Sequence, residues 1–124
     1  MGTRSLTRIW REKDKTCLVA IYLQFDGYLE GHGADLKDFL QDMKLCDGIG
    51  TAQEKGEWAN GMECLSAQIV SHFKKGVGGT YLTTPDNEQE WIYDIWEENG
   101  EFYVKVFAYD KVQYEGKIKE MIIK

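Results

Sequence analysis

Residues 16–33 read TCLVAIYLQFDGYLEGHG, an apolar alternating run that passes directly into a glycine-rich loop. Successive side chains of a strand point to opposite faces, so alternate residues of Thr16–Phe25 share a face. One face is wholly apolar and is expected to lie on the core; it carries Cys17, Val19, Ile21, Leu23 and Phe25. The other face ends in Tyr22 and Gln24, which are therefore placed to reach whatever the loop holds.

The loop Gln24–Gly33 contains three glycines, two acids, two aromatic residues and a histidine. A strand-to-helix loop of this composition can bring backbone N–H groups and a ring face close to a small ligand. Acids beside a Gly-Tyr turn are also typical of a purely structural loop, because Asp side chains bond the amides that follow them. The residues alone leave both interpretations open.

The whole pattern predicts a single α+β domain over residues 1–124, an antiparallel β-sheet with two α-helices packed on one side. Leu6–Arg11 pairs with Thr16–Phe25, and Asn99-Gly100 forms a hairpin turn because Asn-Gly supplies positive φ angles. Further strands are expected at Tyr81–Thr84, Trp91–Glu97, Phe102–Tyr109 and Ile118–Ile123. One face of the strand Phe102–Tyr109 is unusually aromatic, since it carries Tyr103, Lys105, Phe107 and Tyr109. This composition predicts that the face forms a subunit interface rather than the wall of a ligand site.

Apolar residues at helical spacing predict the two helices. The first runs from Asp35 to about Lys44, with Leu36, Phe39, Leu40 and Met43 on the core. The second begins at Asn60, because an Asn N-cap with Glu63 three residues later makes a capping box. Its apolar stripe is Met62, Leu65, Ile69 and Phe73, and the glycines at 76, 78 and 79 end it.

Composition excludes several classes of function. The 124 residues carry a net charge of −6, which opposes binding to long nucleic acid. No apolar run approaches the roughly 18 residues needed to span a membrane, so no membrane partner is expected. Three cysteines without a close pair indicate reduced thiols in a cytoplasm.

Catalytic groupings are poor. Cys64 and His72 lie eight residues apart on one helix, about 12 Å, which is beyond hydrogen-bond reach. The two histidines, His32 and His72, have no spacing typical of a zinc site, and no phosphate-loop or dinucleotide motif is present. We therefore expect no catalytic residue, no metal and no cofactor.

Binding features are better developed. Gly27–Gly33 and Asn60-Gly61 could each present backbone amides to an anion. Arg4 and Arg8 share one strand face. They form either a small basic patch able to hold a diphosphate, or charges that keep an edge strand from pairing with other chains. Aromatic residues able to stack on a base are plentiful, and spacing does not select among them.

Five motifs occur in an order that resembles a known family. They are MGTRSLT at 1–7, QFDGYLEGHG at 24–33, DGIG at 47–50, NGMECLSAQ at 60–68 and GGTYL at 78–82. Together they resemble the phage and prophage Thoeris anti-defence sponge proteins of the first-described type. The likeness covers roughly the first two thirds of the chain.

The resemblance implies a function. Such proteins bind a cyclic ADP-ribose isomer, such as glyco-cyclic ADP-ribose, in the cytoplasm of the bacterial host and sequester it without cleaving it. Some relatives also hold cyclic oligonucleotides, and they assemble as homo-oligomers, dimers or larger. A sponge needs a closed site with a stacked base and a neutralised diphosphate, but no tuned acid or base.

On this interpretation the ligand contacts can be assigned. Arg4 or Arg8 would pair with the diphosphate, and Tyr22, Phe73 or an aromatic residue of the C-terminal strands would stack on the adenine. The remaining expected contacts are Gln24, Asp26 and Asn60 for hydroxyls or base edges, and Gly27, Gly61 and Met62 at the two glycine features. Two alternatives remain: a small nucleotide hydrolase that uses Asp26 and His32, and a phage protein that docks a host protein on its aromatic strands.

Overall fold

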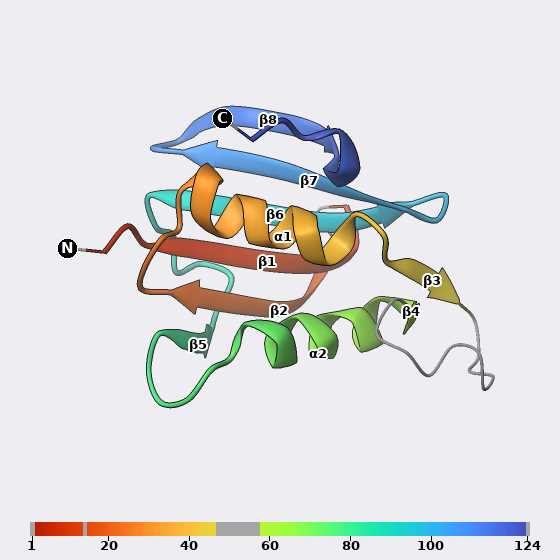
Figure 1. Ribbon diagram of the computed structural model, residues 1–124, viewed down its shortest axis with the longest axis horizontal. Coiled ribbons are helices and arrows are strands. Elements are labelled where there is room, and N and C mark those ends of the chain that lie inside the picture. Colours follow the sequence, from red (N-terminus) through yellow and green to blue (C-terminus); the bar gives the residue numbers. More distant parts are fainter. Residues whose placement is uncertain (1, 14, 47–57, 124) are drawn as a thin grey trace.

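The computed structural model of the chain describes residues 2–13, 15–46 and 58–123. Within these ranges the chain forms a small single-domain α+β fold with one six-stranded sheet in the order β5-β2-β1-β6-β7-β8 (Figure 1). The strands are β1 (Ser5–Glu12), β2 (Lys15–Leu23), β5 (Thr80–Thr83), β6 (Trp91–Glu98), β7 (Glu101–Ala108) and β8 (Lys111–Lys117).

The sheet is mixed rather than purely antiparallel, which corrects the expectation. Every neighbouring pair is antiparallel except β1 and β6, which run parallel. A parallel neighbour needs a long crossover connection, and here the chain passes through both helices and β5 between β2 and β6. Hairpin patterns reveal the antiparallel pairs but give no information on a pairing of this range.

The helical elements lie between β2 and β5. A π-helical turn, η1 (Leu29–Gly33), leads directly into α1 (Ala34–Leu40), and α2 (Gly61–Phe73) follows a parallel pair of short strands, β3 (Lys44–Cys46) and β4 (Trp58–Asn60). The first helix therefore ends at Leu40, earlier than the expected end at about Lys44. The DGIG motif at 47–50 lies outside the described residues. Among the described helices, none is long and apolar enough to cross a membrane.

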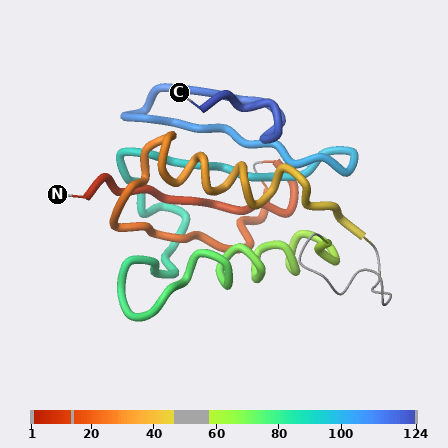
Figure 2. The backbone as a smooth tube through the Cα atoms, in the orientation of Figure 1, coloured from red at the N-terminus to blue at the C-terminus, as the bar shows by residue number. Residues whose placement is uncertain are grey.

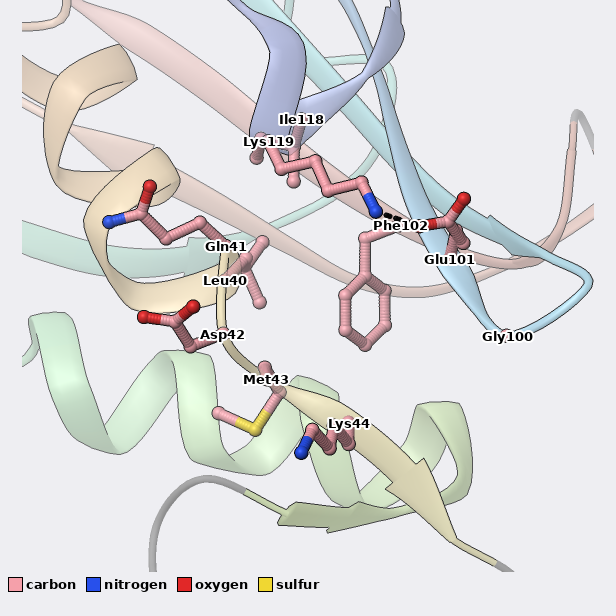
Figure 3. A pocket seen from close by; sticks show the side chains of 10 residues that line it. All are labelled: Leu40, Gln41, Asp42, Met43, Lys44, Gly100, Glu101, Phe102, Ile118 and Lys119. Carbon is pink, nitrogen blue, oxygen red and sulfur yellow. Dashed lines mark ion pairs between the residues drawn. The ribbon is translucent and has the colours of Figure 1, made fainter.

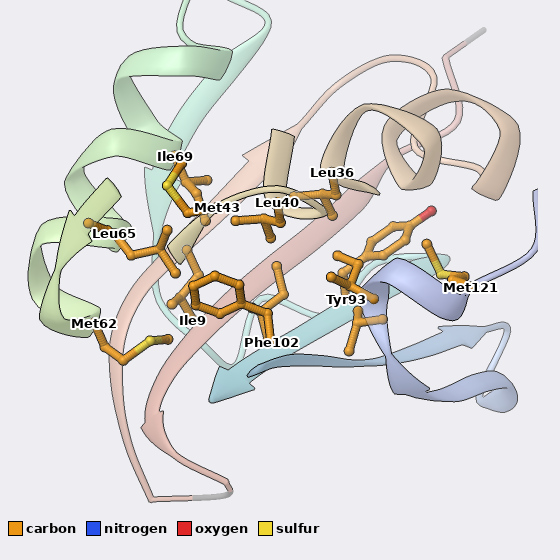
Figure 4. Close-up of a cluster of buried hydrophobic side chains, with 14 of the residues drawn as sticks. Ile9, Leu36, Leu40, Met43, Met62, Leu65, Ile69, Tyr93, Phe102 and Met121 are labelled. Atoms are coloured by element: carbon orange, nitrogen blue, oxygen red, sulfur yellow. The ribbon is translucent and has the colours of Figure 1, made fainter. Parts of the chain in front are cut away.

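Side chains from both helices and from the sheet meet in one hydrophobic cluster (Figure 4). Leu36 and Leu40 come from α1, Leu65 and Ile69 come from α2, and the central strands contribute Ile9 among others. A second, smaller cluster consists of Leu6, Ala20 and Ile92, which alternate with residues of the first and so occupy the other face of the sheet.

The expected core face of β2 is correct only in its middle. Ile9 pairs with Val19 but Trp10 pairs with Cys17, so a β-bulge shifts the register there. Because the side-chain period is two, the bulge moves Cys17 to the smaller cluster and Leu18 to the main one. Phe25 lies beyond the end of β2 and is 59% exposed, so its expected place in the core is wrong.

The last strand also differs from expectation. β8 occupies Lys111–Lys117, whereas Ile118–Glu120 forms a short 3₁₀ helix, η3. Ile118 and Met121 are both buried in the main cluster, at the three-residue spacing that a 3₁₀ turn places on one side. The strand itself is largely polar because it forms an edge of the sheet, and it therefore lacks an apolar signal. The Asn99-Gly100 turn is confirmed, with positive φ at both residues.

Candidate functional site

The loop that follows β2 is fixed to the sheet by its backbone. The Gly27 N–H donates to the Thr3 carbonyl over 2.9 Å, and the Tyr93 hydroxyl donates to the Gly27 carbonyl over 2.7 Å. The His32 N–H donates to the Asp26 carbonyl over 2.8 Å, which closes the loop on itself. Asp26 has φ of 58°, a left-handed conformation that Asp tolerates better than most residues. The loop is therefore a built structure rather than a slack connection.

Gly27 is required at its position by space. A Cβ there would lie 2.7 Å from Ser5 Cβ and 2.9 Å from the carbonyl carbon of Arg4. We expect Gly27→Ala to lower the free energy of unfolding by about 1–3 kcal/mol, because the backbone of β1 would have to shift. Urea unfolding would measure this, with Gly76→Ala as a control where a Cβ meets nothing within 4 Å and only the positive φ is strained. Wild-type stability in Gly27→Ala would contradict the close packing.

A cavity of about 350 Å³ opens beside this loop, between the end of β2, the start of α1 and the end of α2. All three segments lie at the same end of the molecule as the N-terminus (Figure 2). We call it the loop cavity. Its aromatic walls are Phe25, His72 and Phe73, and its charged groups are Asp26, Asp35 and Lys75; Leu23 and His32 complete the lining.

His32 forms the deepest polar part of this wall and is only 2% exposed. Its Nε2 lies 2.7 Å from Thr7 Oγ1 in a shared hydrogen bond, and its ring packs edge-on against Phe73 and Tyr93. Nδ1 is buried and has no hydrogen-bond partner among the residues that the structure describes. Burial lowers the pKa of His32 to about 3, because the charged ring would lose its hydration. His32 is therefore a neutral group at physiological pH.

The structure brings some of the predicted contacts to the loop cavity and others close to it. Asp26 and Phe73 line the cavity, and Gly27 is buried at the base of the loop. Tyr22 and Gln24 lie on the β5 side, where Tyr22 packs against Tyr81 and the Gln24 amide oxygen accepts from the Gly79 N–H. Arg4 is exposed directly before β1.

Arg8 is engaged within the protein. Its guanidinium donates to both carboxylate oxygens of Asp94, over 2.6 and 2.9 Å, and to the Pro85 carbonyl. Trp10 Nε1 donates to the same carboxylate over 3.0 Å. Burial by itself lowers the pKa of Arg8, but the hydrogen bond and the charge of Asp94 outweigh burial, and the net pKa is raised. The arrangement is a structural ion pair and leaves Arg8 poorly placed for a diphosphate.

The start of α2 lies away from the loop cavity. Gly61 and Phe73 are the two ends of this helix, about 18 Å apart at 1.5 Å per residue. The expected capping box is wrong, since Asn60 makes no side-chain cap hydrogen bond and Glu63 pairs with Arg11 at the surface. Met62 is buried in the core cluster. The structure thus does not bring Asn60, Gly61 or Met62 into one site with Asp26.

Sequence reasoning missed four residues of the cavity or gave them no binding role: His32, Asp35, His72 and Lys75. They come from η1, α1 and the end of α2, and no motif joins these elements. The sequence gives one local hint. Lys75 follows the predicted contact Phe73 by two residues and directly precedes the glycines that end the helix.

A larger cavity of about 670 Å³ lies between the end of α1, the start of β7 and η3 (Figure 3). The Glu101 carboxylate in its lining accepts from Lys117 over 2.6 Å and from Lys119 over 2.5 Å. Hydrogen bonds from these two lysines lower the pKa of Glu101 to about 2. Its apolar floor of Leu40, Phe102 and Ile118 belongs to the core. With this carboxylate already paired, the cavity is a weaker candidate than the loop cavity.

The described residues contain no group of three or more His, Cys, Asp or Glu side chains that could hold a metal ion. Comparison of the chain with models of protein families, with curated proteins and with solved structures finds no significant match. A functional assignment therefore depends on the geometry of the loop cavity together with the sequence motifs.

Proposed function

We propose that the protein binds a cyclic ADP-ribose isomer, of the glyco-cyclic ADP-ribose type, and sequesters it without cleaving it. In this role it would act as a phage-encoded inhibitor of bacterial Thoeris defence in the host cytoplasm. The observation that carries the proposal is the loop cavity, which is built on the most distinctive motif of the chain and is lined by both Asp26 and Phe73.

The dimensions and chemistry of the cavity suit a nucleotide-sized ligand. Its volume of about 350 Å³ is in the range of small-molecule sites, which extends from about 300 to 1,000 Å³. Phe25 and Phe73 offer ring faces for a base, and the carboxylates of Asp26 and Asp35 can accept hydrogen bonds from hydroxyl groups.

The geometry favours binding over the hydrolase alternative. A general base must reach the proton it removes and have a pKa near the working pH. The Nε2 atom of His32 already bonds Thr7, and the low pKa of the ring makes it a very weak base. Asp26 is exposed, and the hydrogen bond that its carboxylate accepts comes from the Tyr28 hydroxyl rather than from a histidine.

We also infer that both helices pack on one face of the sheet, which the shared hydrophobic cluster supports. The opposite face would then be free to join copies of the chain in a homo-oligomer. On that face Tyr103 stacks on Trp96, and Tyr109 at the strand end is 67% exposed. Binding of a cyclic oligonucleotide as a second ligand is part of the same proposal.

We expect Phe25→Ala to weaken binding of the cyclic ADP-ribose isomer by about tenfold or more, since stacking on one base contributes about 1–3 kcal/mol. Isothermal titration calorimetry on the full chain would measure the affinity. Ile122→Ala is the control, because it removes another large exposed apolar side chain, one that does not line the cavity. Equal affinities for wild type and Phe25→Ala would remove the loop cavity from the binding site.

A further inference from the structure

The loop cavity carries more negative than positive charge. Asp26 and Asp35 contribute two carboxylates, and Lys75 is the one lysine or arginine among the described residues that line it. Both aspartates and the lysine are exposed side chains of its lining. His32 in the deep wall adds a neutral ring, and its buried Nδ1 has no hydrogen-bond partner within the described part of the chain.

These charged groups are available to a ligand. Within the described ranges, the side chains of Asp35 and Lys75 form no hydrogen bond or ion pair. The carboxylate of Asp26 accepts one long hydrogen bond, 3.3 Å, from the hydroxyl of Tyr28. The loop cavity therefore presents free carboxylate oxygens, which at neutral pH only accept hydrogen bonds.

The nucleoside and diphosphate parts of a cyclic ADP-ribose isomer interact with this surface very differently. Diphosphate oxygens are acceptors with negative charge, so they repel carboxylates and cannot bond them. Ribose hydroxyls are donors, and a purine ring can stack on Phe25 or Phe73. A single lysine does not neutralise two carboxylates and a diphosphate together.

We propose that the loop cavity takes the nucleoside part of the ligand, with ribose hydroxyls donating to Asp26 and Asp35, while the diphosphate stays at the mouth beside Lys75. This inference rests on the proposed function and deepens it, because it specifies which part of the ligand occupies the loop cavity. Asp35 and Lys75 thereby gain roles in specificity.

The double variant Asp26→Asn/Asp35→Asn tests the orientation by the sign of its effect. If the nucleoside enters, loss of the charged acceptors should weaken binding of cyclic ADP-ribose about tenfold or more. If the diphosphate enters, loss of two repelling charges should instead tighten binding, which would overturn the inference. Calorimetry on the full chain would decide, with Asp38→Asn as the control, since Asp38 is an exposed carboxylate of α1 that does not line the cavity.

Lys75→Gln provides an independent test. It should weaken binding of adenosine monophosphate several-fold and leave adenosine unchanged, as measured by ligand-observed NMR at millimolar ligand. Equal weakening of both would overturn the placement of the phosphate.

Asn is tolerated in the left-handed conformation of Asp26, so thermal unfolding should show that the double variant Asp26→Asn/Asp35→Asn stays folded.

Failure of the inference and failure of the proposed function are distinguishable. Cyclic ADP-ribose binding that is unchanged or tighter in the double variant overturns the orientation but leaves the proposed function standing. If wild-type protein binds no cyclic ADP-ribose isomer, the proposed function fails. Binding of adenosine to wild type and to the double variant then tests whether the loop cavity is a nucleoside site. Adenosine binding that is lost in the double variant supports a nucleoside site, whereas absence of adenosine binding overturns it.

Discussion

Between about pH 7.5 and pH 2 we expect the wild-type protein to lose about 5 kcal/mol of folding free energy because of His32 alone. The unfolded chain takes up the proton at a pKa of 6.5, whereas in the folded protein burial lowers this pKa to about 3. Between these values the unfolded state holds more protons, so stability falls as the pH falls. Each pH unit in this range costs about 1.4 kcal/mol.

The variant His32→Gln isolates this effect, since an amide can still bond Thr7 but does not titrate. Urea unfolding at pH 7, 6, 5 and 4 should show the difference between wild type and His32→Gln shrinking by about 3 kcal/mol by pH 4. Carboxylates that titrate in both proteins cancel in this difference. Parallel curves for wild type and His32→Gln would contradict a buried neutral His32.

The second large effect concerns the Arg8–Asp94 ion pair, whose side chains are 16% and 10% exposed. Asp94→Ala should lower the free energy of unfolding by about 3–5 kcal/mol, because it leaves the guanidinium without its partner. Trp10 Nε1 loses its acceptor in the same change. Chemical denaturation would measure the loss.

A double variant separates the cost of an unpaired charge from the value of the pair. Arg8→Met with Asp94→Leu replaces both charges by apolar groups, and it should be more stable than Asp94→Ala alone. The double variant should also keep wild-type affinity for the ligand, since the ion pair lies outside the loop cavity. A double variant less stable than Asp94→Ala, or one that no longer binds, would contradict a purely structural Arg8.

Local patterns predicted most of the elements. Alternation identified β1, β2, β6 and β7, and the apolar stripe of α2 identified that helix. What failed depends on distant partners. The bulge that reverses Cys17 arises from pairing with β1, and the parallel contact of β1 with β6 joins segments about 85 residues apart. β8 is missed because an edge strand needs no apolar face.

The candidate site follows the same division. The loop motif indicated Asp26 and Gly27 directly, because glycines and acids are local signals. Arg8 looked like a free cation, since its partner Asp94 lies 86 positions further along the chain. Asp35 and Lys75 reach the cavity only because the start of α1 and the end of α2 lie beside the end of β2, which no spacing in the sequence reveals.

The central claim is that the folded chain holds a cyclic ADP-ribose isomer intact. The most direct test mixes protein and ligand, removes unbound ligand by gel filtration, denatures the protein by heat and analyses what is released by chromatography. We predict near-stoichiometric release of unchanged ligand from wild type and much less from Phe25→Ala. Recovery of cleaved products, or of no nucleotide at all from correctly folded wild-type protein, would contradict the claim.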